Sequence, residues 1–228
     1  MRQRPGCVRW LEAAVASWRP EPPRVGGVWR AFRQVSPKWP PLVHAAGAPH
    51  PEQESGRWHR YGETYAQYLS LSPQGAWSEL VRYHGIRDET LAREQRRNLW
   101  LVTVEEHDLA DLRSFQAYDD CGLDPALAAG EHGPAQLLAD ELRDAGYRGL
   151  LSPSAALAGA VNLTLFGERY ELPEPELAGL DPDLWLTVEL VAPEAWPPLG
   201  LLMTTCHQGQ PHAGLERHLA GGGLPSAP

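Results

Sequence analysis

The chain has 228 residues and a mass of 25.2 kDa, enough for one sizeable domain with a full core or for two small ones. Its formal net charge of −9 argues against a nucleic-acid-binding surface, because such a surface is basic. An anionic ligand would have to be held by local arginines and helix N-termini, since the overall field repels it. Hydrophobic residues make up 43 % of the chain, so we expect a folded protein.

Cysteine usage and the character of the N-terminus favour a cytoplasmic protein. Cys7, Cys121 and Cys206 are widely separated and form no CxxC pair, so neither a disulfide framework nor a zinc site is expected. The scattered histidines indicate no other metal site. The first residues are partly basic but include Glu12 and no uninterrupted apolar core, a poor match to a signal peptide. Because no run of about eighteen apolar residues occurs, no membrane span is predicted.

The chain is predicted to open with an appendage, residues 1–24. Residues Val8–Trp18 follow an amphipathic helical pattern, and the proline-rich link Pro20–Pro23 comes next. Such an appendage can dock on the body of the chain or on another subunit, so a homodimer is left open. We expect residues 25–205 to carry the fold, and residues 206–228, rich in Gly, Pro and His, to form a flexible tail.

The body opens with a predicted strand over Val28–Gln34 that carries two arginines. Alternation would place Arg30 and Phe32 on one face of this strand and Arg33 on the other. The segment Ser36–Ser55 contains five prolines and no clear period. We therefore expect a loop there.

A strand followed by a helix is predicted next. The strand covers Tyr65–Leu71, Ser72 is a plausible N-cap, and Pro73 suits the first turn of a helix that runs to about His84. The buried stripe of this helix would consist of Ala76, Trp77, Leu80 and Val81. Glu79 falls at the edge of the stripe, where a carboxylate can be half sheltered. A solvated surface glutamate fits the same helical wheel.

The second half of the body mixes strands and helices without strict alternation. The strands are predicted over Asn98–Val104, Tyr147–Leu151, Asn162–Phe166 and Leu184–Val191. The helices are predicted near Asp108–Phe115, over Ala135–Ala145, and from Ser152-Pro153-Ser154 to about Ala160, with a loop reaching Gly133 between the first two. This mixture favours an α+β fold over a doubly wound parallel sheet.

Two Ser-Pro pairs share one sequence context. Leu71-Ser72-Pro73 and Leu151-Ser152-Pro153 are each predicted to end a strand and to begin a helix. Free backbone N–H groups and the positive end of a helix dipole would then lie at a strand end, which is a seat for an anion. Alternatively, each pair is simply a common helix start.

The familiar catalytic motifs are missing from the sequence, among them the Walker loop, GxGxxG after a strand, GxSxG and HExxH. What remains is a set of arginine, tyrosine, glutamate, serine and asparagine side chains: Arg30, Arg57, Tyr65 or Tyr68, Glu79, Ser154 and Asn162. Taken singly, each such residue is more often structural. Their order and spacing along the chain give the set its weight.

This pattern resembles the RES domain, a family named for its arginine, glutamate and serine and found in bacterial toxin–antitoxin systems. The matching pieces are Val28-Trp29-Arg30, Ser55-Gly56-Arg57-Trp58 with Gly62, Tyr68-Leu69-Ser70 leading to Ala76 and Glu79, and Gly149-Leu150-Leu151-Ser152-Pro153-Ser154 followed by Asn162-Leu163. Together they span about Val25 to Val191. Two positions depart from the family pattern: Ser55 replaces a glycine and His59 replaces an asparagine.

The resemblance implies a compact fold like that of ADP-ribosyltransferases, with a mixed or antiparallel sheet core and surrounding helices. It further implies that the protein binds NAD as a substrate and cleaves its nicotinamide–ribose bond, and that an antitoxin, usually of helix-turn-helix type, covers the active site. Catalytic roles would fall to Glu79, Arg30 and Tyr68, and contacts with NAD to Arg57, Gly56, Tyr65, Ser154 and Asn162.

The chemistry of NAD cleavage suits these residue types. Glu79 would stabilise the oxocarbenium-like ribose or hold its 2′-hydroxyl. Arg30 and Arg57 would clamp the pyrophosphate, Tyr68 would contact the nicotinamide end, and Ser154 would donate to phosphate or ribose.

Several functions are compatible with this resemblance. The leading one is hydrolysis or phosphorolysis of NAD, and ADP-ribosyl transfer to a protein target differs from it only in the acceptor. The changes at Ser55 and His59 leave room for an inactive relative that serves as a partner-binding module. A cytoplasmic α+β protein with a chance match to the motifs is the remaining alternative.

Overall fold

A mixed six-stranded sheet organises the computed structural model, which describes residues 21–39, 41–42, 54–166 and 186–221. The strands are β1 (Arg24–Val35), β2 (Ala66–Ser70), β3 (Arg97–Asp111), β4 (Gly149–Pro153), β5 (Val161–Phe166) and β6 (Leu186–Ala195). Their order is β1-β2-β5-β4-β3-β6, and β1 also pairs with β3, so the first five of these strands close into a ring that β6 extends. Only the β3–β4 pairing is parallel. The predicted α+β class is confirmed.

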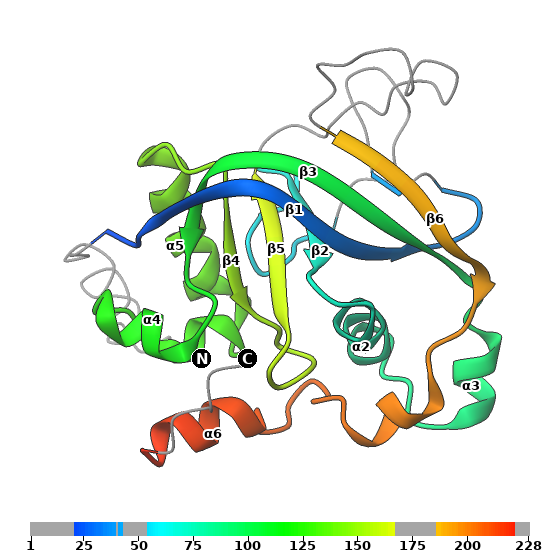
Figure 1. Ribbon diagram of the computed structural model, residues 1–228. Helices are drawn as coiled ribbons and strands as arrows, with labels where there is room; N and C mark the ends of the chain where they lie inside the picture. Colours follow the sequence, from blue (N-terminus) through cyan, green and yellow to red (C-terminus); the bar gives the residue numbers. More distant parts are fainter. Residues whose placement is uncertain (1–20, 40, 43–53, 167–185, 222–228) are drawn as a thin grey trace, which may run out of the picture.

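Helices pack on two sides of this ring. Figure 1 shows the long strands β1 and β3 arching over α2. The helical elements are α2 (Pro73–Tyr83), α3 (Glu89–Glu94), α4 (Phe115–Asp120), α5 (His132–Asp144), α6 (Ala213–Leu219) and the 3-10 turns η1 (Pro125–Ala128) and η2 (Leu199–Met203). In the view of Figure 1, α4 and α5 lie on one side of β4 and β5, and α2 lies on the other.

Three apolar clusters hold these elements together. The first fills the ring of strands and includes Ala31, Val102 and Leu163. The second joins α4 and α5 to the sheet, and the third packs α2 against β1, β3 and η2. Each fully buried Leu side chain in such clusters contributes about 1.5–3 kcal/mol.

Helix α2 forms as the sequence predicts. The Ser72 side chain accepts the Gly75 N–H at 3.1 Å, Pro73 occupies the first turn, and His84 caps the C-terminus. Gly85 then turns the chain with a φ of 61°, a conformation that favours glycine. All four residues of the predicted apolar stripe are buried, and Glu79 lies at its half-buried edge.

The helix predicted near Asp108–Phe115 is wrong, because strand β3 continues to Asp111. Arg24 pairs with Ala110 and Val25 with Leu109, so the early part of β1 extends the ladder. This cross-strand pairing outweighs the local helical preference of the segment. Helix α4 begins only after Ser114, whose side chain accepts the Ala117 N–H.

The helix predicted after the second Ser-Pro pair is also wrong. Strand β4 runs through Pro153, and Ser152 and Pro153 pair with Asn162 and Val161 of β5. A turn over residues 154–160 closes this hairpin, with Ser154 N–H donating to Ala160 O at 2.8 Å. Only the first Ser-Pro pair therefore begins a helix, so the predicted second anion seat does not form.

The predicted flexible tail is partly wrong as well. Its described part, up to Gly221, contains α6 and the buried side chains of Cys206, His207 and His212. Residues 222–228 and the predicted helix Val8–Trp18 lie outside the described residues, and the division into 1–24, 25–205 and 206–228 stays a prediction.

Helix α3 is an element that the sequence reasoning missed. It is capped by Asp88, whose carboxylate accepts the Leu91 N–H.

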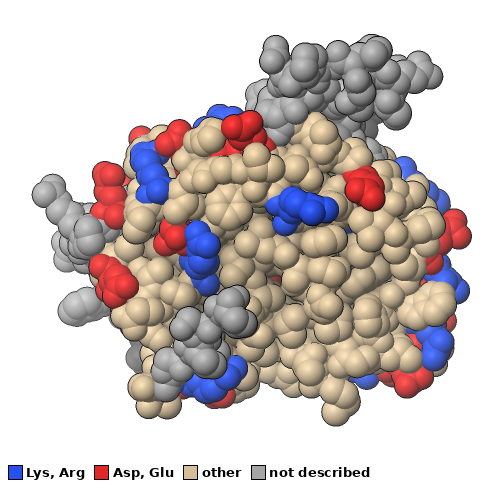
Figure 2. Space-filling model, in the orientation of Figure 1, with Lys and Arg blue, Asp and Glu red and all other residues tan. Residues whose placement is uncertain are grey.

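The surface in Figure 2 mixes charges of both signs. On that face, Lys and Arg side chains are scattered among Asp and Glu and among uncharged residues. No helix within the described ranges is long and apolar enough to cross a membrane.

Candidate active site

The carboxylate of Glu79 joins three segments that are far apart in the sequence. Ser154 Oγ donates to Glu79 Oε1 at 2.7 Å, and Asn162 Nδ2 donates to the same oxygen at 2.7 Å. Helix α2, the turn after β4 and the start of β5 therefore meet at one atom. Within the described part of the chain, Glu79 Oε2 has no hydrogen-bond partner, so one carboxylate oxygen is held in place and the other is available.

Ser154 lies fully buried at the centre of its turn. Besides donating to Glu79, its Oγ accepts the N–H groups of Ala156 at 3.2 Å and Leu157 at 3.1 Å. A serine hydroxyl has one proton, and here that proton is directed to the carboxylate. The geometry thus makes Ser154 the residue that fixes Glu79, whereas the sequence predicted a donor at a helix N-terminus.

Asn162 supports the carboxylate from the sheet. In β5 it pairs with Ser70 of β2 and Ser152 of β4, which fixes its backbone on both sides. Its Nδ2 is directed to Glu79, and its Oδ1 is buried with no hydrogen-bond partner among the residues described. Removing either donor would leave the half-buried carboxylate with one hydrogen bond.

The glycine–arginine loop, residues 55–60, is folded onto the hydroxyl of Tyr68. This hydroxyl accepts the Trp58 N–H at 2.9 Å and lies 2.8 Å from His59 Nδ1. A Cβ atom on Gly56 would lie only 2.4 Å from the same hydroxyl oxygen, so this close approach requires glycine. Burial raises the pKa of Tyr68 above its ordinary value, which keeps the hydroxyl protonated.

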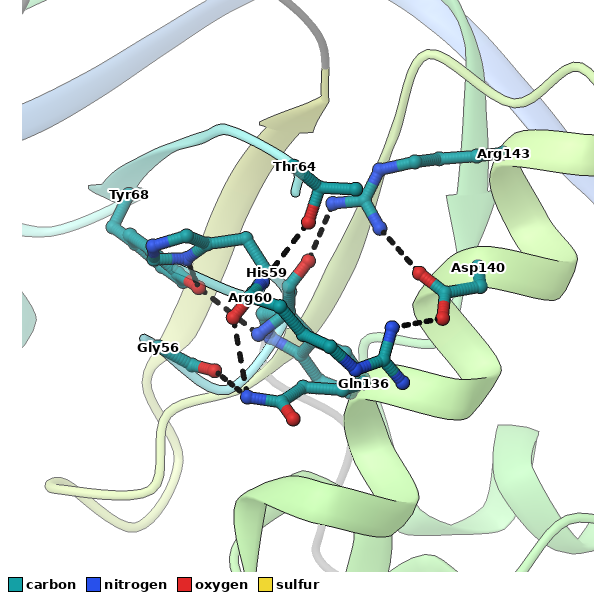
Figure 3. Close-up of polar contacts among 9 residues, drawn as sticks. Gly56, His59, Arg60, Thr64, Tyr68, Gln136, Asp140 and Arg143 are labelled. Atoms are coloured by element: carbon teal, nitrogen blue, oxygen red, sulfur yellow. Dashed lines mark hydrogen bonds and ion pairs between the residues drawn. The ribbon is translucent and has the colours of Figure 1, made fainter. Parts of the chain in front are cut away.

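Helix α5 fixes the same loop from the other side, as Figure 3 shows. Gln136 Nε2 donates to Gly56 O at 2.8 Å and to His59 O at 3.1 Å. Arg143 donates to Trp58 O at 2.5 Å. Asp140 forms ion pairs with both Arg60 and Arg143. Side chains of one helix thus hold three successive parts of the loop.

The side chain of Arg57 extends from this loop to two backbone carbonyls. Its guanidinium donates to Leu127 O at 3.2 Å and to Gly130 O at 2.8 Å. Burial lowers the pKa of Arg57, and the negative charge of Glu79 opposes that effect. An electrostatic interaction therefore links the predicted arginine to the predicted carboxylate.

Arg82 is a residue near the site that the sequence reasoning missed. It lies one turn beyond Glu79 on the same face of α2, is half-buried, and donates to Cys206 O at 2.6 Å. Its positive charge contributes to the lowered pKa of Arg57. The spacing of three residues from Glu79 is the signal that could have identified it.

The remaining predicted residues, Arg30 and Tyr65, are placed by the alternation of side chains along their strands. Arg30 is exposed on β1, but regular alternation places it on the same face as Phe32, which packs with the α2 cluster. Arg30 thus lies on the α2 side of the sheet. Tyr65 immediately precedes β2 and is 42 % exposed, and its spacing of three places it on the opposite face from Tyr68.

Among the residues that the structure describes, no group of three or more His, Cys, Asp or Glu side chains could hold a metal ion.

Two buried histidines next to the site predict how stability depends on pH. Burial lowers the pKa of His207 and of His212 below the ordinary value. The charged groups that act on them are Arg82 and Arg87 for His207, and Arg82, Glu79 and Arg217 for His212. The unfolded chain then binds more protons than the folded one as the pH falls below about 6.5.

We therefore expect the thermal unfolding midpoint to decrease by a few degrees between about pH 7.5 and pH 5.5, measured by tryptophan fluorescence. A His207→Gln variant should show a shallower decrease. Equal midpoints for the wild type at the two pH values would contradict this expectation.

Comparison with known proteins places this chain within a known family. The family model described as RES domain matches residues 27–188. A protein of Mycobacterium tuberculosis named probable NAD(+) phosphorylase is 36 % identical over 143 residues, which cover 58 % of this chain and 68 % of that protein. A chain in the crystal structure of the M. tuberculosis MbcT–MbcA toxin–antitoxin complex has a similar fold, with a TM-score of 0.51, 19 % identity, and coverage of 72 % of this chain and 82 % of that one.

The family match includes every segment that builds the Glu79 site: most of β1, the glycine–arginine loop, α2, the turn after β4, and β5. The resemblance seen in the sequence motifs is therefore confirmed over most of the chain. This protein belongs to the RES domain family.

Proposed function

We propose that this protein binds NAD and cleaves the bond between nicotinamide and ribose. The observation that carries the proposal is the Glu79 carboxylate, whose Oε1 is fixed by Ser154 and Asn162 while Oε2 is available. The M. tuberculosis relative named probable NAD(+) phosphorylase supports NAD as the substrate.

The proposed chemistry follows from the charge that develops during cleavage. Nicotinamide leaves as a neutral molecule, and the ribose carbon acquires oxocarbenium character. A fixed carboxylate next to this carbon stabilises the positive charge without having to reorganise. Because two donors hold Oε1, the other oxygen can face the ribose in one orientation.

The arginines supply the proposed contacts with the pyrophosphate. Arg57 and Arg82 use their NH1 groups to hold backbone carbonyls, and their remaining N–H groups can serve an anion. Arg30 would approach from β1 on the same side of the sheet. This local positive charge offsets the repulsion expected from a chain with a net charge of −9.

The acceptor that we propose is inorganic phosphate, in line with the relative's name. The C1″–N bond breaks, nicotinamide takes the electron pair of that bond, and a phosphate oxygen forms the new bond to C1″. The products are nicotinamide and ADP-ribose 1″-phosphate.

The experiment incubates the purified protein with NAD in buffers with and without phosphate and identifies the products by mass spectrometry. We expect nicotinamide in both buffers, with faster release and ADP-ribose 1″-phosphate when phosphate is present. ADP-ribose alone in phosphate buffer would contradict the choice of acceptor. A labelled protein band would assign ADP-ribosyl transfer instead, and intact NAD would overturn the proposed function.

A partner protein is the remaining part of the proposal. The similar fold found in a toxin–antitoxin complex supports an antitoxin that silences this protein. Expression of the chain alone should then arrest bacterial growth, and co-expression of its antitoxin should restore it.

A further inference from the structure

The C-terminal segment from Cys206 to His212 contacts both sides of the Glu79 site, although it lies outside the family match. Cys206 O accepts the Arg82 guanidinium at 2.6 Å, and Cys206 N–H donates to Ala156 O at 2.8 Å. Arg82 belongs to α2, which carries Glu79, and Ala156 belongs to the turn that holds Ser154. Cys206 thus connects α2, which carries Glu79, to the turn that carries Ser154.

His212 makes a second contact with the same turn. It is 6 % exposed, and its Nε2 lies 3.1 Å from Ser154 O. Its Nδ1 accepts the Leu215 N–H at 3.1 Å and thereby caps α6. Since Nδ1 must be unprotonated to accept, the hydrogen-bond network assigns the proton to Nε2, which donates to the Ser154 carbonyl.

The imidazole ring has little room to move. It packs against the ring of Phe115, with the ring centroids 5.4 Å apart. Gly214 lies on another side, and a Cβ there would be only 3.0 Å from His212 Cε1. The ring is therefore fixed by packing as well as by its two hydrogen bonds, so its Nε2 can define the position of the Ser154 carbonyl.

We propose that His212 is a positioning residue for Glu79 and that residues 206–212 form a strap that ties α2 to the Ser154 turn. His212 fixes the Ser154 backbone, Ser154 Oγ fixes Glu79 Oε1, and Cys206 fixes the distance between the turn and α2. The two hydrogen bonds of His212 join it to Ser154 O and to Leu215 N–H, so it acts on Glu79 through Ser154. The expected effect on nicotinamide release rests on the proposed function. The expected effect on the order of the Ser154 turn does not.

Two substitutions of His212 test its two hydrogen bonds one at a time, because each is expected to keep one bond and to lose the other. His212→Gln can place an N–H donor near the position of Nε2 but does not reproduce the helix cap. His212→Asn can reproduce the cap with its Oδ1, because Asn is a favoured N-cap residue, but it is too short to reach Ser154 O. Leu215→Ala serves as the control, because the Leu215 side chain packs against the core and its truncation leaves both hydrogen bonds of the His212 ring possible.

The kinetic experiment measures kcat and KM for nicotinamide release together with the thermal midpoint. We expect His212→Asn to lower kcat about tenfold with little change in KM, since small misplacements of a catalytic group can cost up to about a hundredfold. The midpoint should fall as well, because the buried ring is truncated and Ser154 O loses its donor. We expect His212→Gln to keep kcat within about threefold of wild type and to lower the midpoint. Leu215→Ala should give the same two results. If kcat instead followed the midpoint across these variants, the positioning role would be overturned.

A second measurement does not depend on activity. Hydrogen exchange at the Ala156 and Leu157 amides, which donate to Ser154 Oγ, reports the order of the turn directly. Exchange should be faster in His212→Asn and similar to wild type in His212→Gln. Equal exchange in both variants would overturn the strap. If the wild type released no nicotinamide while the exchange results held, the proposed function would fail and the structural role would stand.

Discussion

Replacing Glu79 with glutamine should leave the protein folded and lower the rate of nicotinamide release by about 10²–10³-fold, a loss of roughly 3–4 kcal/mol of transition-state stabilisation. Glutamine has nearly the same shape, and its carbonyl oxygen can still accept hydrogen bonds from Ser154 and Asn162. The variant therefore removes the negative charge and keeps the framework. The measurement is the single-turnover rate at saturating NAD, with far-UV circular dichroism to verify folding.

The matched control is Glu94→Gln, which changes the same charge at an exposed position at the end of α3. We expect wild-type turnover from this control, because removing an exposed surface charge has little effect. We also expect Glu79→Gln to keep an NAD-dependent rise in the unfolding midpoint, because the arginines that we propose hold the pyrophosphate are unchanged. If turnover by Glu79→Gln stayed within about threefold of wild type, Glu79 would have no role in the chemistry.

Gly56→Ala is expected to have the second-largest effect, because it breaks the contact between the glycine–arginine loop and Tyr68. The added Cβ would lie 2.4 Å from the Tyr68 hydroxyl oxygen and 2.7 Å from His59 Cε1. Both side chains are held in place, so the loop must shift and carry Arg57 with it. We expect a loss of about 1–3 kcal/mol in the free energy of unfolding, typical of overpacking, measured by urea titration.

The same variant should raise the KM for NAD by about tenfold, because a displaced Arg57 would lose about one of the charge-assisted hydrogen bonds that we propose it makes to the pyrophosphate. Gly133→Ala is the control, since a Cβ on Gly133, near the start of α5, meets no atom within 4 Å. Alanine there should be neutral or slightly stabilising. Wild-type stability and KM in Gly56→Ala would show that the loop does not depend on this close contact.

Local signals in the sequence were sufficient for the central helix. Ser72 at the N-cap, Pro73 after it and the apolar stripe specify α2 without reference to other segments, and they place Glu79 at the half-buried edge. The strand that carries Tyr68 was also predictable, because its aromatic and apolar residues are typical of a buried strand. The motif resemblance, in turn, was sufficient for the family.

Contacts between distant segments explain what could not be predicted. The two Ser-Pro pairs look alike locally, but pairing with β5 keeps Ser152 and Pro153 in a strand. As a result, Ser154 holds the carboxylate from a turn and not from a helix N-terminus. Pairing of Arg24 with Ala110 and of Val25 with Leu109 likewise lengthens β3 beyond its apolar core.

The contribution of the C-terminal segment could not be predicted either, because it also depends on contacts between distant segments. Its composition is that of a flexible tail, and nothing local indicates that Cys206 and His212 would contact the turn that holds Ser154. The support of the glycine–arginine loop by Gln136 and Arg143 also depends on the placement of α5 beside it. Such tertiary contacts have no signature in a single sequence.

Release of nicotinamide from NAD by the purified wild-type protein, followed by chromatography, is the most direct measurement of the proposed role of the Glu79 site. We expect many moles of nicotinamide per mole of protein, with NAD consumed in equal amount. Intact NAD after long incubation with folded protein, at concentrations that raise its unfolding midpoint, would contradict cleavage of the nicotinamide–ribose bond at this site.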